Sequence, residues 1–171
     1  KRAGWLSALF MSETLTATAM GYYEHEIARA VVLALFIPLI ISSGGNSGSQ
    51  ASTLVVRAMA LGEVRLRDWW RVMRREFAAG LALGSILGMI GLLRILFWPT
   101  RAALYGEHYV LVAHTVACSL VGIVLWGTIS GSMLPLIMRR LGFDPASASA
   151  PFVATLVDVT GLIIYFTVAS V

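Results

Sequence analysis

Two features of the sequence combine residue types that could hold a cation. One is Asp158, a carboxylate in the apolar stretch PFVATLVDVTGLIIYF, which contains no basic residue. The other is the run Ser42–Gln50, which reads SSGGNSGSQ and lies between two apolar blocks. A carboxylate within a membrane costs about 2.5–3.5 kcal/mol on insertion scales, so it points to function by default. We expect Asp158 to face a water-filled path or bind a cation, with a hydrogen bond to a neighbouring helix as the plainer alternative.

Helical spacing brings small and hydroxyl residues next to this carboxylate. Ala150, Ala154 and Asp158 recur every four residues and share one face of a helix, and Thr155 lies on nearly the same face. This pattern is typical of a narrow polar lining. Glu13 lies in another apolar stretch among serines and threonines. It is either a second group along a pathway or a structural hydrogen-bond partner.

The run Ser42–Gln50 would supply neutral oxygens and allow close approach. Pro38 loosens the helical hydrogen bonding before it, and its glycines let a backbone or a hydrated ion come near. Oxygen ligands with one acid suit Mg²⁺ better than Zn²⁺ or Cu⁺, and Mg²⁺ gives up its water reluctantly. A twofold dimer would bring two copies of Asp158 around one axis. The predicted pore-lining residues are Asn46, Gly48, Gln50, Gly44, Ala150, Thr155 and Glu13.

Other chemistry finds little support in the sequence. His114 and Cys118 are four residues apart and could bind a soft metal, but two ligands do not make a site, and a packed histidine is the commoner case. Cys118 is the single cysteine, so no disulfide can form within the chain. No nucleophile elbow, phosphate-binding loop, HExxH or CxxC motif occurs. We therefore predict that the chain is not an enzyme.

The composition is that of an integral membrane protein. Hydrophobic residues make up 58% of the 171 residues and charged residues 13%, and the mean hydropathy is +0.81, whereas globular domains carry about 25% charged residues. We predict an all-α domain with five transmembrane helices. The chain begins with Lys1, from which we expect a soluble region upstream. The predicted spans are roughly Trp5–Tyr22, Ile27–Ala60, Phe77–Trp98, Tyr109–Met138 and Ala150–Val171.

The basic residues predict the orientation. Arg29, Arg94 and Arg101 lie on one side of these spans, and the other 10 of the 13 basic residues lie on the opposite side. Because positive charge is enriched in cytoplasmic loops, we expect the N-terminus in the cytoplasm and the C-terminus outside. The net charge of +4 then reflects topology and not nucleic-acid binding. The connecting segment Leu61–Glu76 is expected along the membrane interface, with docking of a soluble domain as an alternative.

Two stretches resemble a known family. The stretch GGNSGSQASTLVVRAMALGEV resembles the second transmembrane helix of the MgtE family of magnesium channels, and FDPASASAPFVATLVDVTGLIIYF resembles its fifth. The resemblance covers essentially the whole chain. It implies a homodimer with an axial pore, in which the aspartate matching Asp158 binds hydrated Mg²⁺. Backbone carbonyls matching Ser42, Gly45 and Ala154 would contact the water shell. This chain has Ser42 and Ser49 where some members have glycine or asparagine, which puts an amide contribution at Ser49 in doubt.

The resemblance also implies a regulated channel. Family members usually carry a cytoplasmic N domain and a pair of CBS domains upstream, which sense intracellular Mg²⁺. Residues 1–171 would then be the transmembrane pore domain, in the inner membrane of a bacterium and in contact with lipid. It would conduct hydrated Mg²⁺ passively into the cytoplasm, with Mn²⁺, Co²⁺, Ni²⁺ or Ca²⁺ as competing ions. The alternatives are a carrier coupled to protons or sodium, with Asp158 and Glu13 as its sites, and a membrane module that transports nothing.

Overall fold

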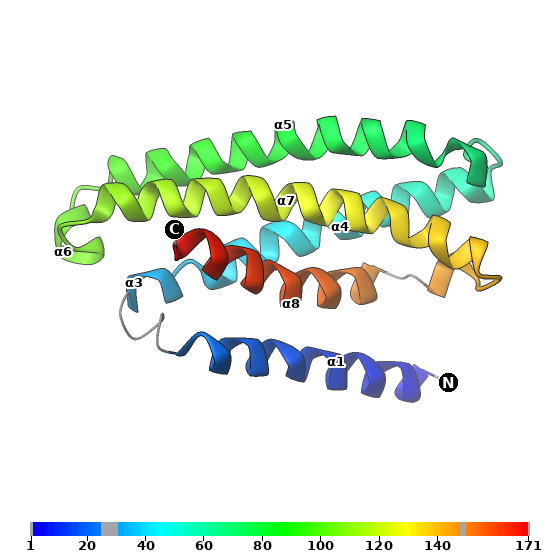
Figure 1. The fold of residues 1–171 in the computed structure, drawn as a ribbon, viewed down its shortest axis with the longest axis horizontal. Helices are drawn as coiled ribbons and strands as arrows, with labels where there is room; N and C mark the ends of the chain where they lie inside the picture. The colour runs from blue at the N-terminus through cyan, green and yellow to red at the C-terminus, as the bar shows by residue number, and fades with distance from the viewer. Residues whose placement is uncertain (1, 25–30, 148–149, 171) are drawn as a thin grey trace.

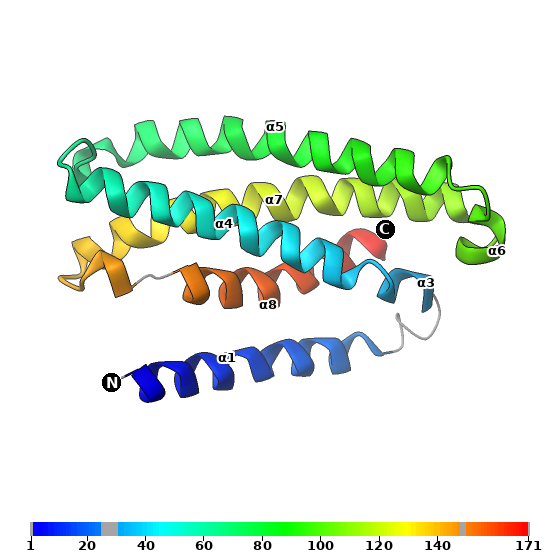
Figure 2. The same cartoon turned by 180° about the vertical axis from the view of Figure 1, so that it is seen from behind.

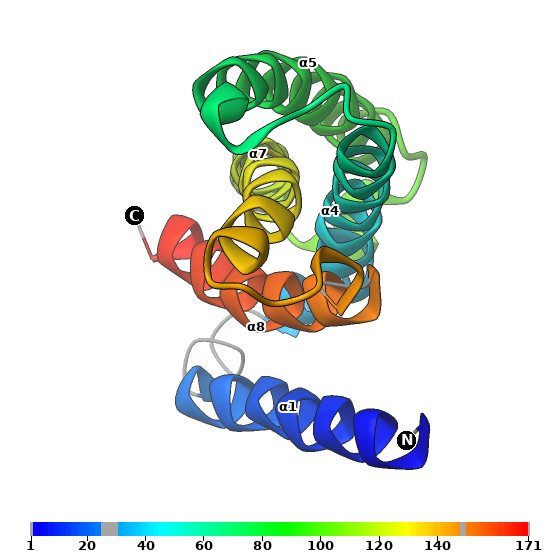
Figure 3. The same cartoon turned by 90° about the vertical axis from the view of Figure 1, so that its right-hand side faces the viewer.

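The computed structural model describes residues 2–24, 31–147 and 150–170, and every regular element in these ranges is a helix. Figures 1 and 2 show the long helices lying side by side, and Figure 3 shows the bundle from its end. The all-α prediction is therefore confirmed for this part of the chain. The elements are α1 (Arg2–Tyr22), α3 (Val31–Ala34), α4 (Ile37–Ala60), η1 (Leu66–Asp68), α5 (Trp69–Leu96), α6 (Arg101–Tyr105), α7 (Tyr109–Arg140), η2 (Pro145–Ser147) and α8 (Ala150–Ala169).

Four segments of the described chain are long and apolar enough to cross a membrane. They correspond to the last four predicted spans, and they fit a multi-pass membrane protein. α1 is 21 residues long but is not one of the four, so the first of the five predicted spans stays a prediction. The four segments are Val31–Ala60, Leu66–Leu96, Tyr109–Arg140 and Ala150–Ala169.

The third predicted span, roughly Phe77–Trp98, belongs to a helix that begins before Phe77. α5 begins at Trp69, two turns earlier, so Trp69–Glu76 belongs to the helix and not to a connecting segment. This stretch mixes apolar and basic residues, which is why it reads as an interfacial segment. A helix satisfies its backbone whatever its side chains are, so the extra turns continue α5 beyond its apolar stretch.

The second predicted span contains a break. Its first residue, Ile27, lies outside the described residues, and a turn at residues 35–36 separates α3 from α4. Pro38, in the first turn of α4, lacks the amide N–H that would continue the helical hydrogen bonding from α3. The hydroxyl of Tyr165 on α8 donates to the carbonyl oxygen of Leu33 at 2.8 Å, in a buried position. This hydrogen bond connects the segment before the break to α8.

Glycines let α4 pack backbone to backbone on α7. Gly44 and Gly48 on α4 lie against Gly127 and Gly131 on α7. A Cβ added at Gly48 would lie 2.9 Å from the carbonyl oxygen of Gly127, and one added at Gly131 would overlap the carbonyl oxygen of Gly48. Small residues at such spacing are typical of close helix pairs in membranes.

Glycines on α5 also pack closely against α7. A Cβ added at Gly84 would lie 2.9 Å from Cα of Val121, and one added at Gly88 would lie 2.8 Å from the carbonyl oxygen of Ala117. α4 and α5 follow each other in the sequence, yet their main contacts are with α7 and not with each other. α7 is therefore the helix on which the bundle is built, as the end view shows (Figure 3).

α4 and α7 both end at the same end of the bundle (Figure 1). Gly62 and Gly142 follow these helices with φ of +75° and +82°, a conformation that favours glycine. After α7, the amide of Phe143 donates to the carbonyl of Met138 at 2.9 Å, which closes the helix. We call this end the basic end, because its connections and flanking turns carry exposed Arg65, Arg67, Arg71, Arg139 and Arg140.

α1 packs mainly on α8. The rings of Trp5 and Phe152 stack with centroids 6.2 Å apart, and those of Tyr23, directly after α1, and Phe166 stack at 4.7 Å. Most side chains of α1 are nevertheless exposed, whereas Leu9 is buried. α1 therefore lies at the outside of the bundle (Figure 3), with one face on α8 and the rest uncovered.

Candidate functional site

The polar run and Asp158 meet where α4 and α8 lie antiparallel. The hydroxyl of Ser49 donates to the carbonyl oxygen of Ala150 at 3.0 Å. About one turn further along, a Cβ built on Gly45 would lie 3.7 Å from Cα of Ala154 and 3.3 Å from Oδ1 of Asp158. We call this contact, formed by these five residues, the α4–α8 seam. It joins segments 101 residues apart in the sequence.

α4 is a continuous helix through the whole run. It extends over Ile37–Ala60, so the carbonyls of Ser42 and Gly45 lie in regular helical backbone. Each accepts a helical N–H, and a carbonyl oxygen has two lone pairs. The remaining lone pair can accept a hydrogen from a water molecule. The run therefore suits the water shell of an ion better than the bare ion.

One surface of α4 beside the seam carries uncovered polar side chains. Ser42, Asn46 and Gln50 are exposed, and the Asn46 amide donates to the Ser42 hydroxyl at 3.2 Å. We call these three residues the polar stripe. Lipid offers no hydrogen bonds to such groups, and α4 belongs to a segment apolar enough to span. Water or another protein surface must therefore cover the polar stripe.

Asp158 is half-buried and carries an uncompensated charge. Within the described residues, the charged group that acts on it is Glu13 on α1, another acid, and no basic group does so. Glu13 itself is exposed. Two carboxylates that repel each other attract a cation, so this side of the bundle favours positive ions.

The residues of the run Ser42–Gln50 lie on several faces of α4. Gly44 and Gly48, predicted to line a pore, are buried against α7, and Gly48 also approaches Val153 of α8. Thr155 is buried as well, and its hydroxyl donates to the carbonyl of Pro151 in its own helix at 3.0 Å. Spacing in the sequence could not assign these faces, because the phase of α4 is set by its contact with α7.

Metal-ligating side chains do not cluster in the described part of the chain. In the described part of the chain, no group of three or more His, Cys, Asp or Glu side chains could hold an ion. The ring of His114 makes a 2.8 Å hydrogen bond to the carbonyl of Val110 in its own helix, and Cys118 is exposed.

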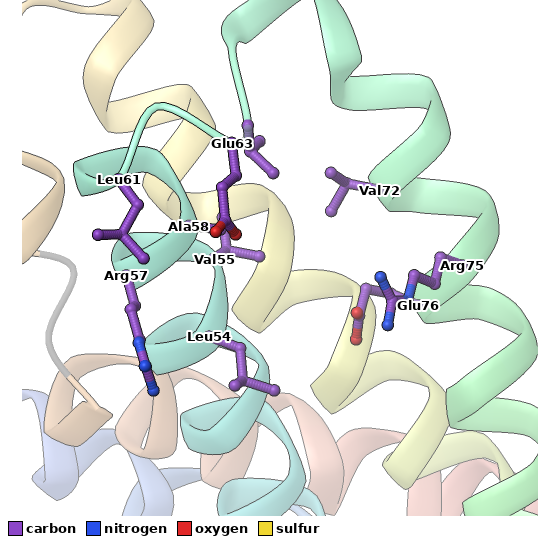
Figure 4. Close-up of a pocket in the computed structure, with 10 residues that line it drawn as sticks. Leu54, Val55, Arg57, Ala58, Leu61, Glu63, Val72, Arg75 and Glu76 are labelled. Carbon is purple, nitrogen blue, oxygen red and sulfur yellow. The ribbon is translucent and has the colours of Figure 1, made fainter.

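A second charged hollow lies between the end of α4 and the start of α5 (Figure 4), and the sequence reading did not single it out. Its volume is about 340 Å³. Glu63 and Glu76 line it together with Arg57 and Arg75, and Arg75 acts electrostatically on Glu76. The two arginines balance the two carboxylates, so a cation gains little here compared with the surroundings of Asp158.

Comparison with known proteins gives the family. The sequence profile of the MgtE family, described as a divalent cation transporter, matches residues 37–168. The chain belongs to the MgtE family. The match runs from the start of α4 into α8, so it includes both sides of the α4–α8 seam. The resemblance of the two helix stretches is therefore confirmed.

Three MgtE proteins are similar over nearly the whole chain. Each is named magnesium transporter MgtE. The protein of Thermus thermophilus is 39% identical over 168 residues, that of Enterococcus faecalis 32% over 170 residues and that of Bacillus subtilis 30% over 170 residues. The alignments include 98–99% of this chain but only 35–36% of each relative. The chain thus spans about a third of the length of these relatives.

Proposed function

We propose that residues 1–171 form the transmembrane pore domain of a homodimeric Mg²⁺ channel. The observation that carries this proposal is Asp158, which is half-buried, has no basic partner among the described residues and lies next to the polar stripe. Such a face is costly against lipid and useful against water. The magnesium transporters among the relatives support Mg²⁺ as the cargo.

A twofold axis beside α4 and α8 would complete the site. The same surface of both protomers would face the axis, so two polar stripes and two copies of Asp158 would surround one path. Two carboxylates match the charge of one divalent ion. The incomplete donor set of the described protomer supports this arrangement.

The ion would pass with its water shell. Mg²⁺ demands octahedral geometry and dehydrates reluctantly, so Asp158 would attract it by charge through water. The carbonyls of Ser42, Gly45 and Ala154 would accept hydrogens from that water, and Asn46 would offer its amide oxygen. Mn²⁺, Co²⁺, Ni²⁺ and Ca²⁺ would compete to the extent that their hydrated sizes agree.

The membrane potential would drive the ion inward. We place the basic end in the cytoplasm of a bacterium, with the N-terminus there, the C-terminus outside and α1 as the fifth span, because positive loops favour the cytoplasm. An inside-negative potential contributes about 2.3 kcal/mol per charge per 100 mV, or roughly 4.6 kcal/mol for a divalent ion. No co-transported ion is needed.

The test is to remove the charge of Asp158. Asp158→Asn keeps the size of the side chain, and the matched control Asp68→Asn removes the charge of a partly exposed carboxylate that accepts from the amide of Arg65 at 2.9 Å. In proteoliposomes containing a Mg²⁺-sensitive dye, Asp158→Asn should abolish saturable Mg²⁺ entry, and Asp68→Asn should leave it within about twofold of the wild type. Mg²⁺ entry at the wild-type rate through a folded Asp158→Asn dimer would contradict the assignment of Asp158 to the pore.

The Glu13–Asp158 pair also favours a second candidate, a carrier coupled to protons or sodium. Two acids that influence each other could share a proton or a sodium ion during transport. Mg²⁺ entry under a fixed membrane potential separates the two. A channel conducts without a pH or Na⁺ gradient, whereas a coupled carrier stops when that gradient is removed.

The greater length of the relatives supports further domains in the complete protein. We propose an N domain and CBS domains on the cytoplasmic side, where they would sense Mg²⁺ and close the pore. Deleting them should raise Mg²⁺ entry at high internal Mg²⁺ without changing entry at low internal Mg²⁺. Equal regulation with and without these domains would contradict the proposal.

A further inference from the structure

A groove between α5 and α7 at the basic end takes no part in the proposed ion path. Its volume is about 690 Å³, a size typical of ligand pockets. Trp69 and Met73 line it from α5, and Met133 and Ile137 line it from α7. These side chains give it an apolar surface.

Two arginines bring positive charge to the same groove. Arg67 and Arg140 both line it and are exposed. Neither forms an ion pair with a carboxylate within the described residues. No acidic side chain lines the groove. It therefore combines an apolar surface with two unneutralised guanidinium groups, which suit an amphipathic anion.

The position of the groove along the helices indicates where that anion comes from. It lies where α5 begins and α7 ends, at one end of two segments that can span the membrane. Trp69 is 50% exposed there, and tryptophan is enriched at the depth of the lipid headgroups. The arginines are then at headgroup level, with the apolar residues towards the hydrocarbon.

We propose that this groove binds one anionic phospholipid. The phosphate lies between the guanidinium groups of Arg67 and Arg140, and an acyl chain lies along Met73, Met133 and Ile137. Basic pockets between transmembrane helices bind anionic headgroups in this way. A zwitterionic lipid would leave its ammonium group without an acidic partner, so the groove selects phosphatidylglycerol over phosphatidylcholine.

The test measures phosphatidylglycerol bound to the full-length protein in neutral detergent, by native mass spectrometry at fixed ionic strength. Each arginine near an anionic headgroup contributes roughly fivefold in affinity, so the double variant Arg67→Gln/Arg140→Gln should bind about 30-fold more weakly. The matched control is Arg71→Gln/Arg74→Gln, which removes two arginines from another hollow at the same end. It should change the affinity by less than about threefold.

A second variant tests the apolar part. Met133→Trp fills the groove and keeps both arginines, so it should weaken binding of long-chain phosphatidylglycerol more than tenfold and leave a short-chain form bound. Equal losses in the two arginine pairs would mean diffuse attraction and would overturn the proposal. Unchanged binding in Met133→Trp, or equal affinity for phosphatidylcholine, would overturn it too. These readouts do not depend on Mg²⁺ entry, so they succeed or fail separately from the channel proposal.

Discussion

Replacing Gly45 or Gly48 by alanine adds the same methyl group to α4 about one turn apart, yet the consequences should differ. At Gly45 the added Cβ would lie 3.3 Å from Oδ1 of Asp158 and 3.7 Å from Ala154. A small rotation of the Asp158 side chain relieves the closer contact. At Gly48 the nearest atoms are the backbone carbonyl oxygen of Gly127 and Cγ1 of Val153, both at 2.9 Å. The backbone at a helix contact cannot rotate away as a side chain can.

The free energy of unfolding should separate the two variants. Alanine is favoured over glycine within a helix by about 0.5–1 kcal/mol, so Gly45→Ala should keep or slightly raise stability. Overpacking costs about 1–3 kcal/mol, from which the gain in helix propensity is subtracted. We expect Gly48→Ala to be destabilised by about 2 kcal/mol, in the upper part of the resulting range, because the added methyl group meets backbone. In a chain of this size that lowers the melting temperature by roughly 4–8 °C.

Ion binding should separate them in the opposite direction. The methyl at Gly45 touches the carboxylate of Asp158 and excludes water from one side of it. A hydrogen bond to a charged group is worth about 1.5–3 kcal/mol, so Mg²⁺ should bind Gly45→Ala roughly tenfold to a hundredfold more weakly. Folded Gly48→Ala should keep the wild-type affinity, because its methyl points towards α7 and not towards the polar stripe.

Both quantities can be measured on the same preparations. Thermal unfolding followed by tryptophan fluorescence gives the melting temperatures, and dye-based Mg²⁺ entry into proteoliposomes gives the apparent affinities. The reasoning is refuted if Gly48→Ala melts with the wild type. It is also refuted if Gly45→Ala binds Mg²⁺ with unchanged affinity, because the assigned faces of α4 would then be wrong.

Three other substitutions test the packing around the site by thermal unfolding. Tyr165→Phe removes the hydroxyl donor to the carbonyl of Leu33, which still accepts from the amide of Phe36 at 3.1 Å, and should cost about 0.5–1.5 kcal/mol; an unchanged melting temperature would mean that the bond to α3 contributes nothing. Ser49→Ala removes the hydrogen bond to Ala150 and should cost about 1 kcal/mol, whereas a more stable variant would count against the α4–α8 seam. Gly142→Ala places a side chain at φ +82° and should cost about 1–2 kcal/mol, and no loss would contradict the turn assigned after α7.

Hydropathy located the described spans well, because length and apolarity are properties of the sequence alone. The predicted starts of α7 at Tyr109 and α8 at Ala150 agree with the structure. The start of α5 was missed, because Trp69–Glu76 alternates charged and apolar residues as an interfacial segment would. A helix can extend past the hydrocarbon without any change in its backbone, and side-chain polarity does not report that extension.

The chemistry of the candidate site followed from residue types, but its geometry did not. A lone carboxylate and a run of small polar residues indicated oxygen ligands for a hard cation, but their spacing did not predict that α4 and α8 bring them together within one chain. The faces of α4 depend on α7, whose Gly127 and Gly131 pair with Gly44 and Gly48. Two glycines four residues apart on each helix were a signal that could have predicted this pairing, and with it the burial of Gly44 and Gly48.

The central place of α7 has a consequence for how the protein is made. α4 and α5 are synthesised before α7, and each turns its glycine face to α7 rather than to the other. A nascent chain that ends before Tyr109 therefore has two inserted helices without their shared partner, and the polar stripe of α4 has nothing to fix its direction. Assembly of these helices must wait until α7 enters the membrane, and the α4–α8 seam forms only when α8 follows.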